Sequence, residues 1–258
     1  MEYNTLLVNR KETYWIIQLN TGTNAFSANL LHDLISIFEE TSQIETLSAL
    51  ILTSTSKIFS VGGDLKAMKT HLDKGNPSGY VDEIVPLVHK VILAMVRHPL
   101  PIIVAINGSI AGGGISLGLA ADHLVSLENA KFAFAFGSLA LSPDSGNSLL
   151  IQKHFGSSFA LESITQGRVV SAYELSQISH MVITSAESLL PKAEELAKNY
   201  SLTDRWATKQ TKYLINRRMI QELEEQLDFE FQSIHEACLR PNFAQLLTKM
   251  LEQMNKKS

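Results

Sequence analysis

The sequence predicts an α/β protein whose alternating strands and helices are followed by a C-terminal helical region. Strand-like apolar runs at 15–19, 48–53 and 102–106 alternate with segments of helical periodicity. This alternation favours an α/β fold over separate blocks of helices and strands. Beyond about residue 185 the pattern is wholly helical.

The N-terminal part of the chain predicts a strand and an amphipathic helix. The strand is the run at 15–19. Ser27 is suited to cap the helix, because its hydroxyl can accept a hydrogen bond from a backbone N–H of the first turn. Leu30, Leu34 and Phe38 then recur at helical spacing.

Two glycine turns are the most informative feature of the chain. Ser-Val-Gly-Gly-Asp at 60–64 comes after the strand-like run 48–53, and Asn-Gly-Ser-Ile-Ala-Gly-Gly-Gly at 107–114 follows the run 102–106. Glycine permits positive φ and lets a ligand approach peptide N–H groups, so two such turns can direct two donors at one oxygen. Residues 114–121 are small and apolar enough for a buried helix, whose N-terminus would add partial positive charge.

The chain around the second turn predicts further elements. Residues 71–79 are rich in loop formers, and we expect this segment to be mobile. A helix over 87–96 should end before Pro99. Two more strands are expected at 123–127 and 131–134.

A membrane span at 102–121 has to be considered, because about 20 uncharged residues can cross a bilayer. This stretch contains Asn107 and several glycines, and Pro101 and Asp122 flank it. It divides naturally into strand, turn and helix, so we expect no membrane association through it.

The C-terminal part predicts two helices with apolar faces. Over 219–238, Leu223, Leu227 and Ile234 lie on one stripe, and a second helix follows the break at 240–242. So much apolar surface needs a cover, which the rest of the chain can provide.

Length and composition agree with a large core and exclude some partners. The 258 residues are 45% hydrophobic, which allows one main domain and a smaller appendage. A net charge of −4 argues against a nucleic-acid partner. Cys238, the one cysteine, is expected to be a buried, inert thiol. The N-terminal residues lack a signal-peptide pattern, so a cytoplasmic protein is the default expectation.

Five segments together resemble the crotonase superfamily of enoyl-CoA hydratases, isomerases and related acyl-CoA enzymes. They are 24–26, 59–66, 101–122, 142–144 and 165–172. The resemblance covers nearly the whole chain. It implies a ββα spiral core at 1–190 that carries the acyl-CoA site, a helical region at 191–258 that forms a homotrimer or a dimer of trimers, and a role in fatty acid metabolism. Coenzyme A would be part of the substrate, and no separate cofactor or metal is implied.

The resemblance also assigns an oxyanion hole. By position in the family, the backbone N–H groups of Gly63 and Gly113 would be the two donors, with Gly62 beside the substrate. Such donors stabilise negative charge that develops on a thioester oxygen.

Further positions match the family's substrate-binding segments. The adenine and pantetheine portions would meet backbone atoms of Asn24, Ala25 and Phe26. Lys57 and Lys66 flank the first turn, where they could contact phosphate or adenine, although exposed lysines are more often solvated surface.

The two glutamates of the family's hydratases are missing. Their positions are occupied here by Ser116 and Phe136. Neither side chain can activate water as paired carboxylates do, so hydration of a 2-enoyl-CoA is disfavoured. Ser116 could bind substrate or water, or it could simply be a small residue inside a packed helix.

Asp144 is the carboxylate that remains. It follows Pro143, as the acidic residue does in the family's isomerase branches. Apolar neighbours such as Phe136 and Leu141 should desolvate it and raise its pKa. Outside the family context, Asp144 in Pro-Asp-Ser-Gly would be read as a turn former, and Asp64 is read as a helix cap.

These observations predict an enoyl-CoA isomerase that moves a double bond from the 3- to the 2-position. Two alternatives stay open. One is another crotonase-type reaction, such as hydration, decarboxylation or hydrolysis, on a thioester of CoA or of a carrier protein. The other is a subunit that binds acyl-CoA without catalysis.

Overall fold

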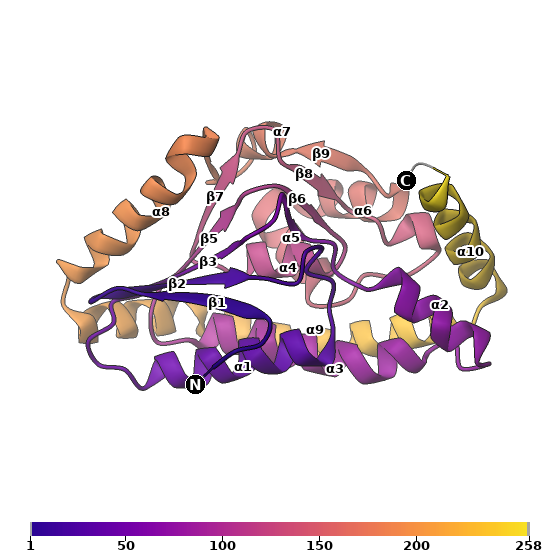
Figure 1. Cartoon of the computed structure of the whole chain (residues 1–258), viewed down its shortest axis with the longest axis horizontal. Helices are drawn as coiled ribbons and strands as arrows, with labels where there is room; N and C mark the ends of the chain where they lie inside the picture. Colours follow the sequence, from indigo (N-terminus) through magenta and orange to yellow (C-terminus); the bar gives the residue numbers. More distant parts are fainter. Residues whose placement is uncertain (1, 257–258) are drawn as a thin grey trace.

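The computed structural model describes residues 2–256, which form two β-sheets surrounded by helices (Figure 1). The first sheet has the order β1 (Leu6–Arg10), β2 (Tyr14–Leu19), β3 (Ala49–Ser54), β5 (Ile102–Ile106), β7 (His123–Leu127) and β10 (Val182–Thr184). The second has the order β4 (Ile58–Ser60), β6 (Ser109–Ala111), β8 (Lys131–Ala133) and β9 (Val169–Ser171). Pairing is parallel except for β1 with β2 and β8 with β9.

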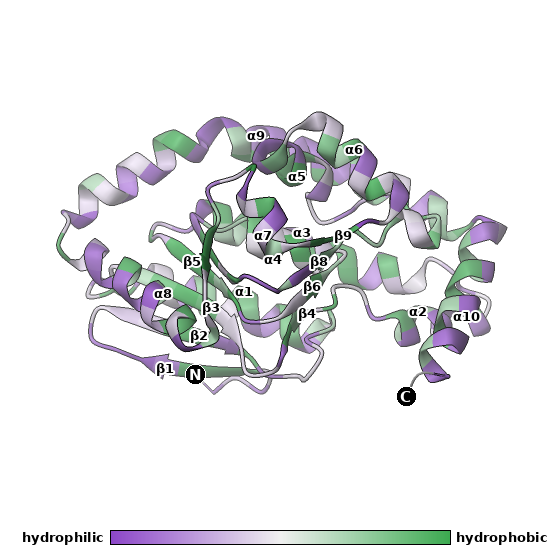
Figure 2. Ribbon diagram, turned by 90° about the horizontal axis from the view of Figure 1, so that it is seen from above, coloured by the Kyte–Doolittle hydropathy of each residue, from purple (hydrophilic) through white to green (hydrophobic). Residues whose placement is uncertain are grey.

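The first sheet is buried on both faces, as parallel sheets usually are. Successive side chains point to opposite faces. On β3, Leu50 and Leu52 join the main core, whereas Ala49 and Ile51 join a smaller cluster on the other face. Figure 2 shows β3 and β5 as strongly hydrophobic strands.

Helices cover both faces of this sheet. In Figure 1, α8 (Ala186–Ser201, orange) lies on one face, while α1 (Ala28–Ser42) and α3 (Gly79–Arg97) run along the other. The long helix α9 (Arg205–Cys238) packs against α3. The other helices are α2 (Leu65–Asp73), α4 (Gly114–Leu119), η1 (Gly137–Leu139), α5 (Asn147–Phe155), α6 (Ser157–Gln166), α7 (Ala172–Ser176) and α10 (Pro241–Asn255).

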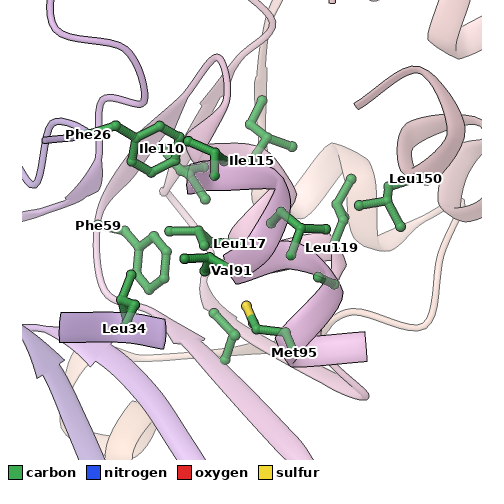
Figure 3. Close-up of a cluster of buried hydrophobic side chains, with 14 of the residues drawn as sticks. Phe26, Leu34, Phe59, Val91, Met95, Ile110, Ile115, Leu117, Leu119 and Leu150 are labelled. Atoms are coloured by element: carbon green, nitrogen blue, oxygen red, sulfur yellow. The ribbon is translucent and has the colours of Figure 1, made fainter. Parts of the chain in front are cut away.

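The short helix α4 lies in the centre of the main core. Its six residues are all buried. Figure 3 shows Leu117 of α4 beside Phe59 of β4 and Val91 of α3. The glycine turn that precedes α4 is therefore attached to the best-packed part of the molecule.

Many expected elements are confirmed. Strand β5 has the predicted bounds, Ser27 caps α1 through a hydrogen bond from Leu30 N, and Cys238 is buried and unpaired. The apolar run 102–121 divides into β5, β6 and α4. Within residues 2–256 no helix is long and apolar enough to cross a membrane.

Two expectations need correction. The loop expected at 71–79 is shorter, because α2 continues to Asp73 and α3 begins at Gly79. The helix expected from residue 219 begins at Arg205. The expected division into 1–190 and 191–258, whose boundary lies within α8, stays a prediction. Helical periodicity is weak over 205–218 because exposed apolar and charged residues alternate there.

Candidate active site

The first glycine turn leaves β4 and is anchored on both sides. Gly62 has φ +71°, a left-handed conformation that glycine adopts without steric cost. Its carbonyl accepts a hydrogen bond from Phe26 N at 2.8 Å, and its N–H donates to Ser60 Oγ at 3.1 Å. Asp64 then caps α2 by accepting hydrogen bonds from Lys66 N and Ala67 N. The expectation that Asp64 is a helix cap is confirmed.

The second glycine turn, expected over 107–114, contains the short strand β6, and its glycines 112–114 lead from β6 into α4. Gly112 also has positive φ, +49°, and its N–H donates to Ala133 O on β8 at 3.0 Å. Because β4 and β6 pair in parallel, their carboxyl ends meet at the same edge of the sheet. The two turns therefore emerge side by side.

The two turns touch each other at Gly62. A Cβ atom on this residue would lie 2.6 Å from Ala111 O and 2.8 Å from Gly113 N. Such distances leave room only for a hydrogen atom, so the close approach requires glycine. This contact sets the distance between Gly63 and Gly113.

The amides of Gly63 and Gly113 are not used by the fold. Among residues 2–256, neither nitrogen donates a hydrogen bond. Both residues line a single cavity of about 430 Å³. Two unpaired N–H donors from different turns, exposed to one cavity, are suited to bind an oxygen that carries developing negative charge.

Asp144 lies next to the second donor. Its Oδ1 atom is 3.5 Å from the position that a Cβ on Gly113 would occupy. Only 9% of the residue is exposed, and burial raises the pKa of its carboxyl group to about 7. The predicted rise is confirmed. A base with a pKa near neutrality is well matched to proton transfer at physiological pH.

The walls of the cavity are mainly apolar. Helix α3 contributes Tyr80 and four aliphatic side chains, and η1 and its flanks contribute Phe136, Leu139 and Leu141. The C-terminal helices supply Ile234, Met250, Leu251 and Met254. Such a lining suits an acyl chain.

The predicted substrate-binding residues divide into two groups. Ala25, Phe26, Lys66 and Phe136 line the cavity together with the predicted catalytic set, which is Gly63, Gly113 and Asp144. The other four, Asn24, Lys57, Gly62 and Ser116, do not line it. Lys57 is exposed outside the cavity, and Gly62 forms the contact between the turns.

Asn24 has a structural task that its sequence position did not reveal. It is fully buried with φ +49°, and its Nδ2 atom donates to Ser54 Oγ and to the carbonyls of Ile58 and Phe59. Its Oδ1 atom accepts from Thr21 N at 2.9 Å. The side chain therefore fixes the chain that leads into 25–26.

The hydratase glutamate positions carry no acid or base here. Ser116 is fully buried in α4, and its Oγ has no hydrogen-bond partner among the described residues. Phe136 presents an aromatic ring to the cavity. Besides Asp144, the cavity is lined by one carboxylate, Asp64, which the cap of α2 already occupies.

Two functional residues escaped the sequence analysis. The Tyr80 hydroxyl donates to Phe26 O at 2.8 Å and accepts from Asp64 N at 2.9 Å. It therefore links the segment 25–26 to the end of the first turn. Glu230 of α9 binds the turn after Asp144. The sequence offers no signal for Glu230, because its burial depends on how α9 packs against the rest of the chain.

Residues 9–256 match the sequence model of a family described as enoyl-CoA hydratase/isomerase. The chain belongs to this family. YngF of Bacillus subtilis, named as a candidate enoyl-CoA hydratase/isomerase, is 35% identical over 213 residues, which cover 81% of this chain and 80% of that protein. Trans-2-decenoyl-[acyl-carrier-protein] isomerase of Streptococcus mutans is 26% identical over 174 residues, 67% of this chain and 66% of that protein.

Solved structures of the family have the same fold. The crystal structure of enoyl-CoA hydratase from Bacillus halodurans gives a TM-score of 0.89 at 21% identity, covering 95% of this chain and 100% of that one. The crotonase-like fold expected from the resemblance is confirmed. This member of the enoyl-CoA hydratase/isomerase family is a crotonase-type enzyme of acyl thioesters.

Replacing Gly62 by alanine should damage the fold and the oxyanion site together. The change forces a Cβ into a left-handed residue and against Ala111 O and Gly113 N, so we expect a loss of about 3 kcal/mol or more in the free energy of unfolding. Gly22→Ala is the matched control, because φ is +76° there but nothing lies within 4 Å. It should cost about 1 kcal/mol. Equal losses in urea unfolding would contradict the close contact.

Replacing Asp144 by asparagine should stabilise the protein at alkaline pH. Because the folded pKa of about 7 exceeds the ordinary 3.8, the carboxyl group destabilises the fold progressively as pH rises from about 4 to above 7. The Asp144→Asn protein should thus match the wild type at pH 4 and exceed it by on the order of a few kcal/mol at pH 8. Urea unfolding at both pH values measures this. The exposed Asp228→Asn change should give no pH-dependent gain, and a pH-independent difference for Asp144→Asn would refute the buried carboxyl group.

Proposed function

We propose that this protein is an enoyl-CoA isomerase that converts a 3-enoyl thioester into the conjugated 2-enoyl thioester. The observation that carries the proposal is the single available carboxylate, Asp144, beside the unpaired Gly113 amide in an apolar cavity. Isomerisation needs only one group that removes and returns a proton.

In the proposed reaction the thioester oxygen binds the amides of Gly63 and Gly113. The Asp144 carboxylate takes a proton from C2, and the C–H electrons move toward the carbonyl to form a dienolate. The two N–H donors stabilise its negative oxygen. Asp144 then returns the proton to C4, which leaves the double bond between C2 and C3. No atom is gained or lost.

Hydration is the weaker candidate. It needs a positioned water and groups that activate it, whereas the two hydratase positions hold the buried Ser116 and the aromatic Phe136. Two relatives that share this family are named as isomerases, trans-2-decenoyl-[acyl-carrier-protein] isomerase and the 1,2-epoxyphenylacetyl-CoA isomerase of Escherichia coli, which is 27% identical. The first of these also makes a carrier-bound thioester a reasonable second substrate for this chain.

We further propose that the chain forms a homotrimer or a dimer of trimers through the first half of α9. The stripe predicted at 219–238 packs on the chain's own core, since Leu223, Leu227 and Ile234 are buried. In contrast, Trp206 and Tyr213 near the start of the same helix are 70% and 57% exposed, and their i, i+7 spacing puts them on one face. Exposed apolar side chains of this size, close together on one element, mark an interaction surface.

The isomerase proposal predicts that Asp144→Asn abolishes proton transfer. Conversion of a 3-enoyl-CoA should be visible as absorbance of the conjugated thioester and should fall by about 10²-fold to 10⁴-fold in this variant. Deuterium exchange at C2 of a bound acyl-CoA should fall with it, whereas Asp228→Asn should retain both activities. Water addition to 2-enoyl-CoA as the main reaction would overturn the proposal in favour of a hydratase. Absence of exchange in the wild type as well would favour a binding subunit.

The assembly proposal predicts sedimentation at three or six times the chain mass of 28.5 kDa. A Tyr213→Asp change should shift the protein toward single chains, because it places a charge in an apolar contact. Leu7→Asp, at an exposed apolar residue of β1, serves as the control and should leave the assembly intact. A wild-type protein that sediments as one chain would disprove the proposal.

A further inference from the structure

Glu230 is a buried carboxylate that does not line the cavity of Asp144 and pairs with no cation among residues 2–256. Only 3% of the residue is exposed. Its Oε2 atom accepts a hydrogen bond from Gly146 N at 2.6 Å, and its Oε1 atom accepts from Ser148 N at 2.8 Å and from Ser148 Oγ. A charged group held this way in the interior needs an explanation.

The donors to Glu230 belong to the turn that carries Asp144. Ser145 and Gly146 both have positive φ, 62° and 81°, so the turn adopts two successive left-handed residues. Helix α9 packs directly on it, since a Cβ on Gly146 would lie 2.8 Å from Leu223 Cδ1. Glu230 thus holds a turn whose backbone conformation is intrinsically unfavourable for Ser145.

The two carboxylates have different surroundings. Three donors converge on Glu230, whereas Asp144 accepts from two, Ser145 Oγ at 3.1 Å and its own backbone N–H. Burial raises the pKa of Glu230 as well, and the hydrogen bonds from Ser148 and Gly146 act against that rise. When two carboxyl groups share an interior, the one that accepts more hydrogen bonds keeps the negative charge and the other takes the proton more readily. Burial, and then the nearby charge of Glu230, both raise the pKa of Asp144.

We propose that Glu230 is a positioning residue: by accepting hydrogen bonds from Gly146 N and Ser148 N it holds the turn 144–148 so that Asp144 faces Gly113. A negative charge bound to this turn also favours the protonated form of Asp144. The catalytic half of this statement rests on the proposed isomerase function. The electrostatic half concerns Asp144 whatever the reaction is.

Other titratable groups near Asp144 do not supply this effect. Besides burial, the charge of Asp144 raises the pKa of Tyr80 on α3 and of Cys238 on α9. Burial raises the pKa of both, that of Cys238 to about 12, so both stay neutral where an enzyme is assayed. Asp64 and Lys66 line the same cavity and remain unchanged in every variant below.

The test is Glu230→Gln, which preserves shape and removes the charge. An amide offers one acceptor oxygen where the carboxylate offers two, so the turn should also loosen. In the wild type the acid limb of kcat/KM with a 3-enoyl-CoA should lie near pH 7. In Glu230→Gln it should move about one unit lower. We expect kcat to fall roughly 10-fold to 100-fold with little change in KM.

A second readout does not depend on activity. The infrared C=O band of the protonated Asp144 carboxyl group, identified as the band absent from Asp144→Asn, should titrate near pH 7 and shift by the same amount in Glu230→Gln. Glu230→Asp keeps the charge and should leave both midpoints near their wild-type values, although a shorter side chain holds the turn less well. Glu225→Gln, at an exposed residue of the same helix, should change nothing.

The outcomes separate the two proposals. An infrared midpoint that does not move in Glu230→Gln overturns the inference, whether or not the protein isomerises anything. A midpoint that moves in a protein without isomerase activity overturns the proposed function alone and supports the role of Glu230. If Glu230→Gln does not fold, Ser148→Ala replaces it. Loss of that hydroxyl donor disfavours the charged form of Glu230, so the midpoint should move in the same direction by less, and an unmoved midpoint overturns the inference.

Discussion

The close contact between two glycine turns is the constraint on which the site depends. Gly62 can lie against Ala111 and Gly113 only because it has no side chain, and the parallel pairing of β4 with β6 brings the turns to the same edge. The fold then leaves two amides unpaired in a cavity wall. Backbone donors inside a protein rarely lack a hydrogen-bond partner, because an unpaired N–H group costs free energy. The tight packing around α4 offsets that cost.

A second constraint is the burial of negative charge. Asp144 is in an apolar cavity where its ionised form is disfavoured. Among the described residues that line this cavity, Lys66 is the one cation, and it is exposed. The ionised carboxyl group therefore reduces stability progressively from about pH 4, and most strongly above pH 7. Catalytic sites that need a strong base are commonly less stable for this reason, because the desolvation that destabilises the charged group also raises its basicity.

The sequence predicted the local features of the site better than its long-range contacts. The glycine turns, the Asp64 cap and the desolvation of Asp144 follow from neighbouring residues. Glu230 could not be placed, because its partners are backbone amides that lie more than 80 positions earlier in the chain. The three-residue strands β4, β6, β8 and β9 were hard to predict for the same reason: each depends on a partner strand rather than on its own periodicity. Only 131–134 was expected among them.

The lining of the cavity links substrate binding to base strength. Phe136 and Leu141 form part of the apolar wall, and the same exclusion of water that suits an acyl chain also raises the pKa of Asp144. A hydratase has to admit and activate a water molecule at this position, and a wall that excludes water works against that. Ser116 and Phe136, which occupy the positions that the resemblance assigns to the hydratase glutamates, and the apolar wall act in the same direction. Both favour chemistry in which the proton removed from the substrate is kept in the site and returned.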